Sequence, residues 1–263
     1  MKQDLQGRWA LVTGASSGFG VDYCHLLAAR GCHLLMAARR AEAMEKLAET
    51  LRARFNIRIE IIAIDLAQSG AAAELFQRSE AAGICVDILI NNAGVGLFGE
   101  FTEQPLTKTL SMLQLNTSCV TELTYLYAQQ MRQRRSGHIL LVASIAAFQP
   151  LPGYAAYSGS KAYILLFGEA LHEELKPDGV HLTVLAPGIS ATAFFEVAGQ
   201  QASWYHRLVE MPSRTVAAAG LDALFAGKAS VLPGLLNQLT VFVCRFLPRQ
   251  WQGRIAGKAM RSK

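Results

Sequence analysis

Residues 9–20 read WALVTGASSGFG, an apolar run that leads directly into a glycine-rich turn. The run favours a strand, and the helical pattern that begins at residue 18 predicts a helix to about residue 30. Glycines in such a turn let the backbone bend sharply and approach a ligand closely. The stretch therefore predicts a strand, a tight turn and a helix in succession.

The rest of the chain repeats this alternation. Further apolar runs predict strands at residues 33–38, 57–64, 86–90, 138–144, 180–186 and 229–233. Helical patterns separate them at residues 41–55, 69–82, 103–135, 154–175 and 213–226. Nearly continuous apolar strands with helices between them are typical of a parallel sheet that is covered on both faces. The sequence thus predicts an α/β protein with a doubly wound (Rossmann) fold, in which a seven-stranded parallel sheet carries helices on both faces.

Length and composition fit a single domain. The chain has 263 residues, of which 51% are hydrophobic and 17% are charged, and this balance argues against disorder. We expect a catalytic domain over residues 1–234 and a helical tail over residues 235–263 that belongs to the same domain. The N-terminal sequence contains no apolar run of the signal-peptide type, so we expect a cytoplasmic protein.

The cysteines are five in number and scattered. They form no CxxC pair and have no histidine cluster beside them: Cys24, Cys32, Cys85, Cys119 and Cys244. This pattern predicts small, buried, reduced thiols and no metal site.

The net charge of +5 comes from the C-terminal tail. From Leu235 onward there is no acidic residue, and there are six basic ones: Arg245, Arg249, Arg254, Lys258, Arg261 and Lys263. Without these six the remainder carries about −1, so we expect no nucleic-acid partner for the body.

Apolar residues at helical spacing accompany the cations: Leu235, Leu239, Phe242 and Phe246, then Trp251, Ile255 and Ala259. A basic amphipathic tail could make a peripheral membrane contact or dock on a partner. The alternative, which we favour, is that it closes the substrate cleft or forms an oligomer contact.

Glycines or polar side chains follow nearly every predicted strand. In doubly wound sheets, ligands bind at the carboxyl ends of the strands, so these residues are candidate contacts of a cofactor. They are Gly14, Ser16, Ser17, Gly18, Phe19 and Gly20 after the first strand, Arg39 and Arg40 after the second, Asp65 and Leu66 after the third, Asn92, Ala93 and Gly94 after the fourth, Ser144 after the fifth, and Pro187 and Gly188 after the sixth.

The spacing of the turn and the end of the second strand predict NADP(H). The glycines let a pyrophosphate approach the N-terminus of the following helix. An acidic residue that would bind an unphosphorylated ribose is missing, because Ala38 stands at its position. Arg39 and Arg40 follow, and guanidinium groups suit a 2′-phosphate. The alternative is that the two arginines cap a solvated helix start.

A tyrosine and a lysine share one face of the predicted helix at 154–175. Tyr157 and Lys161 are four residues apart, which is about one turn. A cation near a phenol lowers the phenol's pKa from its ordinary value of about 10, as general acid–base catalysis needs. Taken alone, the pair much more often means only a lysine beside a surface aromatic, and the rest of the chain reverses those odds.

Together these motifs resemble the short-chain dehydrogenase/reductase family in its compact, NADP-preferring form. The resemblance runs from about Arg8 to Thr192 and more loosely to the end. TGASSGFG is similar to the family's TGxxxGxG turn, with Phe19 in place of a small aliphatic residue, and NNAG at 91–94 is similar to its sheet-stabilising signature. The resemblance implies that Asp65 contacts the adenine. It also implies a nicotinamide contact by Pro187, Gly188 and Thr192, and a catalytic tetrad of Asn116, Ser144, Tyr157 and Lys161.

The implied activity is that of an NADPH-dependent carbonyl reductase or alcohol dehydrogenase. Ser144 would polarise the carbonyl and Tyr157 would donate the proton as general acid. Lys161 would lower the pKa of Tyr157 and hold the nicotinamide ribose, and the resemblance gives Asn116 the role of orienting a water. From the residues alone, an asparagine within a long helix is more often a cap or a kink. The alternative function is a catalytically silent NADP(H)-sensing or scaffold protein on the same fold.

Two irregular stretches, 146–154 and 189–212, are the candidate substrate-binding loops. The second is rich in large apolar side chains: Phe194, Phe195, Trp204, Tyr205 and Met211. They favour a small apolar substrate such as a ketone, a 3-oxoacyl compound or an aldehyde. Alternatively, they pack the loop onto the body or across an oligomer interface. We expect a homodimer or a homotetramer.

Overall fold

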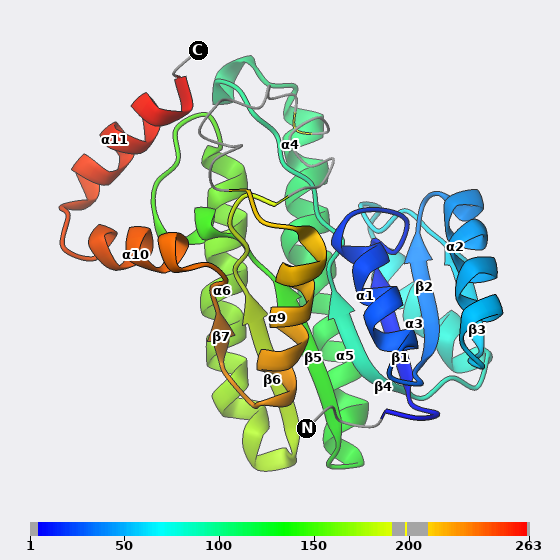
Figure 1. Cartoon of the computed structure of the whole chain (residues 1–263). Helices are drawn as coiled ribbons and strands as arrows, with labels where there is room; N and C mark the ends of the chain where they lie inside the picture. Colours follow the sequence, from blue (N-terminus) through cyan, green and yellow to red (C-terminus); the bar gives the residue numbers. More distant parts are fainter. Residues whose placement is uncertain (1–4, 191–197, 199–209, 262–263) are drawn as a thin grey trace.

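Seven parallel strands form the centre of the protein, as the computed structural model of the chain shows (Figure 1). The structure describes residues 5–190, 198 and 210–261. The strands are β1 (Trp9–Thr13), β2 (His33–Ala38), β3 (Ile59–Ala63), β4 (Val86–Asn91), β5 (Gly137–Val142), β6 (Val180–Leu185) and β7 (Ser230–Val231). Their order across the sheet is β3-β2-β1-β4-β5-β6-β7, and every neighbouring pair is parallel. The predicted fold class is confirmed, and each strand lies within two residues of its predicted ends.

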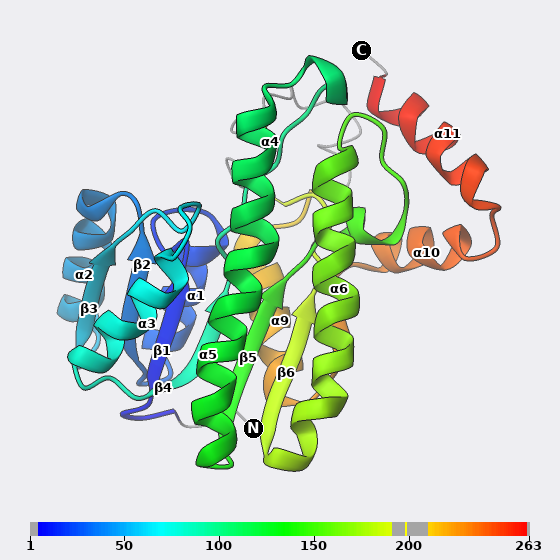
Figure 2. The same ribbon diagram turned by 180° about the vertical axis from the view of Figure 1, so that it is seen from behind.

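Helices cover both faces of the sheet, as the predicted fold requires. The helices are α1 (Phe19–Ala28), α2 (Ala41–Arg54), α3 (Ala71–Ala81), α4 (Leu106–Leu113), α5 (Val120–Gln133), α6 (Ala155–Leu175), α9 (Ser213–Phe225), α10 (Leu235–Cys244) and α11 (Arg249–Arg261). One core packs α1, α2 and α9 on the sheet, through side chains such as Leu27, Met44 and Leu221. The other core packs α3, α5 and α6 on the opposite face (Figure 2). The order of the strands reverses between β1 and β4, and doubly wound sheets bind ligands beside such a reversal.

The long helix predicted at 103–135 is interrupted at its centre. A π-helical turn, Gln114–Cys119, separates α4 from α5. Its residue Asn116 is buried, and the amide of Asn116 bonds the backbone of Val95 rather than solvent. π-helical turns within α-helices occur frequently at functional sites. Asn116 therefore lies in a π-helical turn within the long helix.

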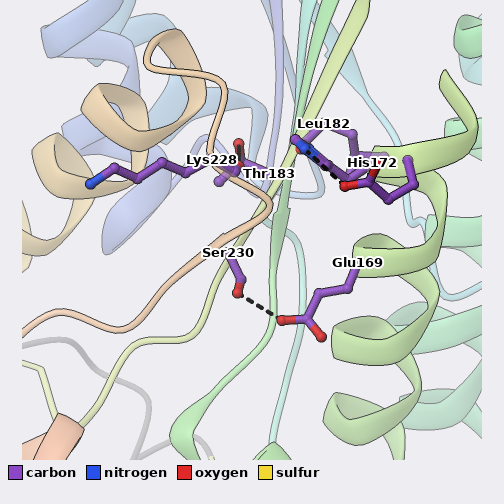
Figure 3. A network of polar contacts seen from close by, with 7 residues as sticks. Glu169, His172, Leu182, Thr183, Lys228 and Ser230 are labelled. Atoms are coloured by element: carbon purple, nitrogen blue, oxygen red, sulfur yellow. Dashed lines mark hydrogen bonds and ion pairs between the residues drawn. The ribbon is translucent and has the colours of Figure 1, made fainter. Parts of the chain in front are cut away.

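Side-chain contacts fasten the edge of the sheet to α6 (Figure 3). Strand β7 has only two residues, and its Ser230 hydroxyl donates to Glu169 of α6 at 2.7 Å. One turn further along α6, a ring nitrogen of His172 lies 2.7 Å from the carbonyl oxygen of Leu182. These contacts hold the end of the domain from which the C-terminal tail leaves.

The cysteines are only partly as predicted. All five are free thiols, and Cys24, Cys32 and Cys119 are buried. Cys85 is exposed and Cys244 is partly exposed, because each lies at the end of an element rather than in a buried strand or helix face.

The C-terminal tail forms two helices that are separated at Pro248. In the described part of the chain, no helix has the length and apolarity needed to cross a membrane.

Candidate active site

The turn after β1 has the close backbone approach that its glycines permit. Gly14 and Gly18 have φ angles of 68° and 53°, in the left-handed region that favours glycine. At Gly20, an added Cβ would lie only 2.1 Å from the Gly14 carbonyl oxygen. The helix α1 therefore starts directly against the turn, and Gly18 and Phe19 at its start line the cleft described below. The N-terminus of a helix suits an anionic group.

Thr13, which the sequence analysis did not single out, joins the ends of β1 and β4. Its hydroxyl donates to the Ile90 carbonyl at 3.2 Å and accepts from the backbone N–H groups of Asn92 and Ala93, each at 3.0 Å. The Asn92 amide returns a hydrogen bond to the Thr13 carbonyl at 2.8 Å. The sequence feature that could have identified Thr13 is its position at the end of the strand, directly before the glycine turn. These bonds fix the NNAG segment beside the turn.

The two arginines after β2 lie at the edge of the same crevice. Both are exposed, and the Arg40 guanidinium donates to the carbonyl oxygen of Ser16 at 3.0 Å and to its hydroxyl at 3.3 Å. Asp65, after β3, accepts from the backbone N–H of Ala67 at 3.2 Å. The predicted phosphate-binding and adenine-contacting residues are thus brought together at one end of the site.

Ser144 and Tyr157 meet at the other end. Both side chains are buried, and a hydrogen bond joins them. The Ser144 hydroxyl also accepts from the backbone N–H of Ala146 at 3.1 Å. Ser144 follows the end of β5 and Tyr157 lies in the first turn of α6, so two consecutive elements place two hydroxyl groups against each other.

The electrostatic state of Tyr157 differs from the prediction. Burial raises the pKa of its hydroxyl to about 12, and the hydrogen bond with Ser144 lowers it by less. The Lys161 ammonium lies 5.9 Å from the centroid of the tyrosine ring and donates to the Val142 carbonyl at 2.8 Å. Burial lowers the pKa of Lys161 to about 8. Desolvation therefore outweighs the expected effect of the cation, because both groups are enclosed.

Asn116 and Gly94 complete the surroundings of Lys161. The Asn116 carbonyl oxygen accepts from Val95 N–H at 3.1 Å, and its amide nitrogen donates to Ser160 at 3.2 Å. A Cβ added at Gly94 would lie 3.2 Å from Asn116 Oδ1 and 3.3 Å from Lys161 Nζ. The absence of a side chain at Gly94 thus lets the chain pass close to the amide and the ammonium.

One cleft of about 550 Å³ connects these groups. Most of the predicted site residues line it: Gly14, Ser16, Ser17, Gly18, Phe19, Arg39, Arg40, Asp65, Leu66, Asn92, Ala93, Gly94, Ser144, Tyr157, Lys161, Pro187 and Gly188. Gly20 and Asn116 lie behind its wall, and Thr192 falls outside the described residues. The structure adds lining residues that the sequence analysis missed, among them Val95, Ser111, Leu115 and Ile145. The two predicted substrate-binding loops contribute Leu151, Tyr154, Ile189 and Ser190 to the lining.

The inner end of the cleft is apolar. Tyr154 lies 5.6 Å from the ring of Tyr157 and 5.1 Å from that of Phe98, and Met112 and Leu151 pack with them. Ala256 of α11 belongs to the same cluster. Of the loop side chains predicted to bind substrate, Met211 is described, with its N–H bonded to Ile189, whereas Phe194, Phe195, Trp204 and Tyr205 lie outside the described residues.

The tail covers the loop between Ser144 and Tyr157. A Cβ at Gly257 of α11 would lie 3.2 Å from Pro152, and the Cys244 thiol lies 3.1 Å from the Gln149 amide oxygen.

In the described ranges, no group of three His, Cys, Asp or Glu side chains could hold a metal ion. The site therefore offers hydroxyl, ammonium and guanidinium groups around an elongated, partly apolar cleft.

Comparison with known proteins identifies relatives of the chain. Residues 8–203 match the family model described as short chain dehydrogenase. The chain is 33% identical over 196 residues to a very-long-chain 3-oxoacyl-CoA reductase of Phaeosphaeria nodorum, covering 73% of this chain and 58% of that protein. It is 33% identical over 190 residues to human 17-beta-hydroxysteroid dehydrogenase type 3, covering 71% and 60%. The chain thus matches less than two thirds of the length of these relatives.

A solved structure matches over nearly the whole chain. A short-chain dehydrogenase from Sphingobium yanoikuyae in complex with NADPH superposes with a TM-score of 0.80 at 27% identity. The match covers 92% of this chain and 97% of that one.

Proposed function

Because this chain belongs to the short-chain dehydrogenase family, we propose that it is an NADPH-dependent oxidoreductase acting on an apolar ketone, 3-oxoacyl compound or aldehyde. The observation that carries the proposal is the hydrogen-bonded pair of Ser144 and Tyr157 in the same cleft as the glycine turn. Two hydroxyl groups at one point can polarise a carbonyl oxygen and protonate it.

Three features support NADP(H) as the cofactor. The turn at 14–20 gives close backbone approach at the start of α1, which suits a pyrophosphate. Arg39 and Arg40 place two guanidinium groups beside Ala38, where a carboxylate would repel a 2′-phosphate. Gly94 and Lys161 line the cleft together, and the Lys161 ammonium suits the ribose hydroxyls of the nicotinamide end. The NADPH complex of the Sphingobium relative supports the same cofactor.

The proposed chemistry assigns a separate task to each side chain. When bound, the nicotinamide supplies or accepts the hydride. The Ser144 hydroxyl donates a hydrogen bond to the carbonyl oxygen, and Tyr157 transfers its proton to that oxygen as negative charge develops. Because burial raises the pKa of Tyr157 to about 12, the hydroxyl is protonated at neutral pH and ready to act as an acid in the reducing direction. Lys161 orients the ribose, and Asn116 positions the segment at Val95.

An apolar substrate is supported by the inner end of the cleft. Phe98, Leu151 and Tyr154 line or adjoin the region beside Tyr157 and offer few groups that would bind a polar chain. The relatives named above are called a very-long-chain 3-oxoacyl-CoA reductase and a hydroxysteroid dehydrogenase. Both names fit a carbonyl carried on a large apolar body.

A panel of carbonyl compounds tests the proposal. We expect NADPH oxidation, followed by its absorbance, with kcat/KM rising along a series of ketones of increasing chain length. Each buried methylene adds about 0.8 kcal/mol, or roughly a fourfold gain, until the cleft is filled. NADPH binding without turnover of any member would favour the silent cofactor-sensing alternative instead.

We also propose a homodimer or homotetramer through the face of α5 and α6 (Figure 2). Tyr125 and Leu166 expose 61% and 69% of their area there, and Tyr163 lies beside them. Exposed apolar surface of this kind is typical of an interface. We expect Leu166→Arg to reduce the assembly to monomers in size-exclusion chromatography with light scattering, whereas Glu49→Lys, on the exposed side of α2, leaves its mass unchanged. A monomeric parent protein would contradict this proposal.

A further inference from the structure

The helix α10 exposes most of its large apolar side chains, whereas an ordinary surface helix buries them. Asn237 and Val241 are the buried residues on its inner side. The Asn237 amide donates to the Pro233 carbonyl at 2.8 Å and packs so closely on Gly188 that an added Cβ there would lie 2.3 Å away. The outer side carries exposed apolar residues at positions 235, 236, 239, 242, 243 and 246. Leu235 is 84% exposed and Phe246 is 73% exposed.

The helix α11 repeats this arrangement. Up to Gly257, where burial is described, its buried residues are Gln252, whose amide donates to the carbonyls of Cys244 and Leu247, and Ala256. Trp251 and Ile255, four residues apart, are more than half exposed. Among the described residues, eight large apolar side chains are exposed on α10, α11 and the turn between them, against six on all the rest. Apart from Val241, burial therefore selects polar and small residues on these helices, and most of the large apolar ones are exposed.

Only positive charge accompanies this surface. Arg245, Arg249 and Arg254 are exposed on the same two helices, and the sequence contains no acidic residue from Leu235 onward. Figure 1 shows α10 and α11, in orange and red, projecting together from one side of the body beyond α6. The outer faces of these helices, defined by the exposed residues named above, are called here the tail surface.

We propose that the tail surface binds a lipid bilayer that contains anionic lipids. Aromatic and aliphatic side chains next to arginines are the composition of helices that lie in the interface of such a bilayer, with the apolar groups among the acyl chains and the cations at the headgroups. An exposed apolar area of this size needs a cover. The anionic lipid provides both the apolar layer and the opposite charge.

A second copy of the chain fits the tail surface less well. In a two-fold contact the same patch meets itself, so the arginines of the two tails would lie near each other. Interface cores are depleted in charged residues for this reason. The rest of the chain carries about −1 in total, so its net charge attracts the basic tail of a second copy only weakly.

Binding would place the cleft beside the lipid. The inner sides of α10 and α11 lie against Gly188 and Pro152, and both of these residues belong to loops at the cleft or next to it. Resting on the proposed function, this position would let an apolar carbonyl compound pass from the bilayer to the site. The bilayer contact itself does not depend on that activity.

Vesicle flotation tests the proposal with the full chain and no substrate. We expect binding to vesicles of phosphatidylcholine with phosphatidylglycerol, little binding to phosphatidylcholine alone, and loss of binding at high salt. The triple variant Arg245→Gln, Arg249→Gln, Arg254→Gln should bind roughly a hundredfold more weakly, at about tenfold or less for each charge. Phe242→Ser with Phe246→Ser should weaken binding by at least roughly tenfold.

A matched triple variant controls for net charge. Lys46→Gln, Arg54→Gln and Arg58→Gln remove the same charge from exposed sites in and after α2, on the other side of the molecule. This variant should keep vesicle binding. All variants should keep NADPH binding and lose at most a few degrees of melting temperature, because the altered side chains are exposed and their contacts, such as Lys46 with Glu42 and Arg58 with Trp9, are surface ones. Equal binding to neutral vesicles, or binding that the tail variants leave unchanged, would overturn the proposal. If the parent does not bind vesicles and the tail variants change the mass of the assembly, the tail surface contacts a second copy of the chain. That result would also overturn the proposal.

Discussion

Replacing Tyr157 with phenylalanine is expected to lower kcat for carbonyl reduction by roughly 10³-fold or more. The substitution removes the proton donor together with one hydrogen bond to the developing oxyanion, and each contribution is worth about 10²-fold or more. The ring is retained, so the apolar cluster with Tyr154 should stay packed. Stopped-flow and steady-state measurements of NADPH absorbance check the loss.

NADPH binding separates this effect from a structural one. Tyr157→Phe should bind NADPH, measured by its fluorescence, within about threefold of the parent, because the hydroxyl contributes little to the ground-state complex. Tyr154→Phe is the matched control, since it removes a hydroxyl from the neighbouring ring in the same cleft and should lower kcat far less. Residual activity of Tyr157→Phe within tenfold of the parent would remove this tyrosine from the mechanism.

The pH dependence gives a second readout of the same residue. The raised pKa of Tyr157, about 12, keeps the hydroxyl protonated well above neutral pH. An acid acts while it is protonated, so reduction should be nearly independent of pH from about 6 to 9. Alcohol oxidation needs the phenolate as base, so its kcat should rise with pH over the same range. Burial lowers the pKa of Lys161 to about 8, so Lys161 loses its positive charge between about pH 6 and 9. Cofactor binding should therefore weaken above about pH 8.

Replacing both Arg39 and Arg40 with alanine is expected to lower kcat/KM for NADPH by roughly 10²-fold or more. A hydrogen bond to a charged group contributes about 1.5–3 kcal/mol, and two such groups face the predicted position of the 2′-phosphate. The parent should prefer NADPH over NADH by a comparable factor. The variant should use NADH as well as the parent does, because NADH has no 2′-phosphate to lose contact with.

Two further variants sharpen the test of the arginines. Arg54→Ala removes an exposed guanidinium from the far end of α2 and should leave the preference unchanged. Ala38→Asp places a carboxylate at the end of β2, where it would repel a phosphate and could bind ribose hydroxyls, so it should shift the preference toward NADH. Equal efficiency of the parent with the two cofactors would contradict the assignment and favour arginines that only cap α2.

Local pattern was sufficient for most of the fold. The apolar runs predicted all seven strands because a buried parallel strand needs a nearly continuous apolar sequence. The division of the long helix was not predictable in position, because it depends on the bonds from Asn116 to Val95, which is 21 residues away. The role of Thr13 was missed for the same reason, since its partners lie 77 to 80 residues further along.

The sequence by itself indicated most of the residues that meet at the candidate site, because the spacing of TGASSGFG, NNAG and Tyr157 to Lys161 follows from the period of a helix and the ends of strands. Tertiary structure alone decided the strand order, the raised pKa of Tyr157, and the outward position of the apolar side chains on α10. All three depend on desolvation and on contacts between different segments of the chain. A local sequence pattern does not determine which segments will pack against a given residue.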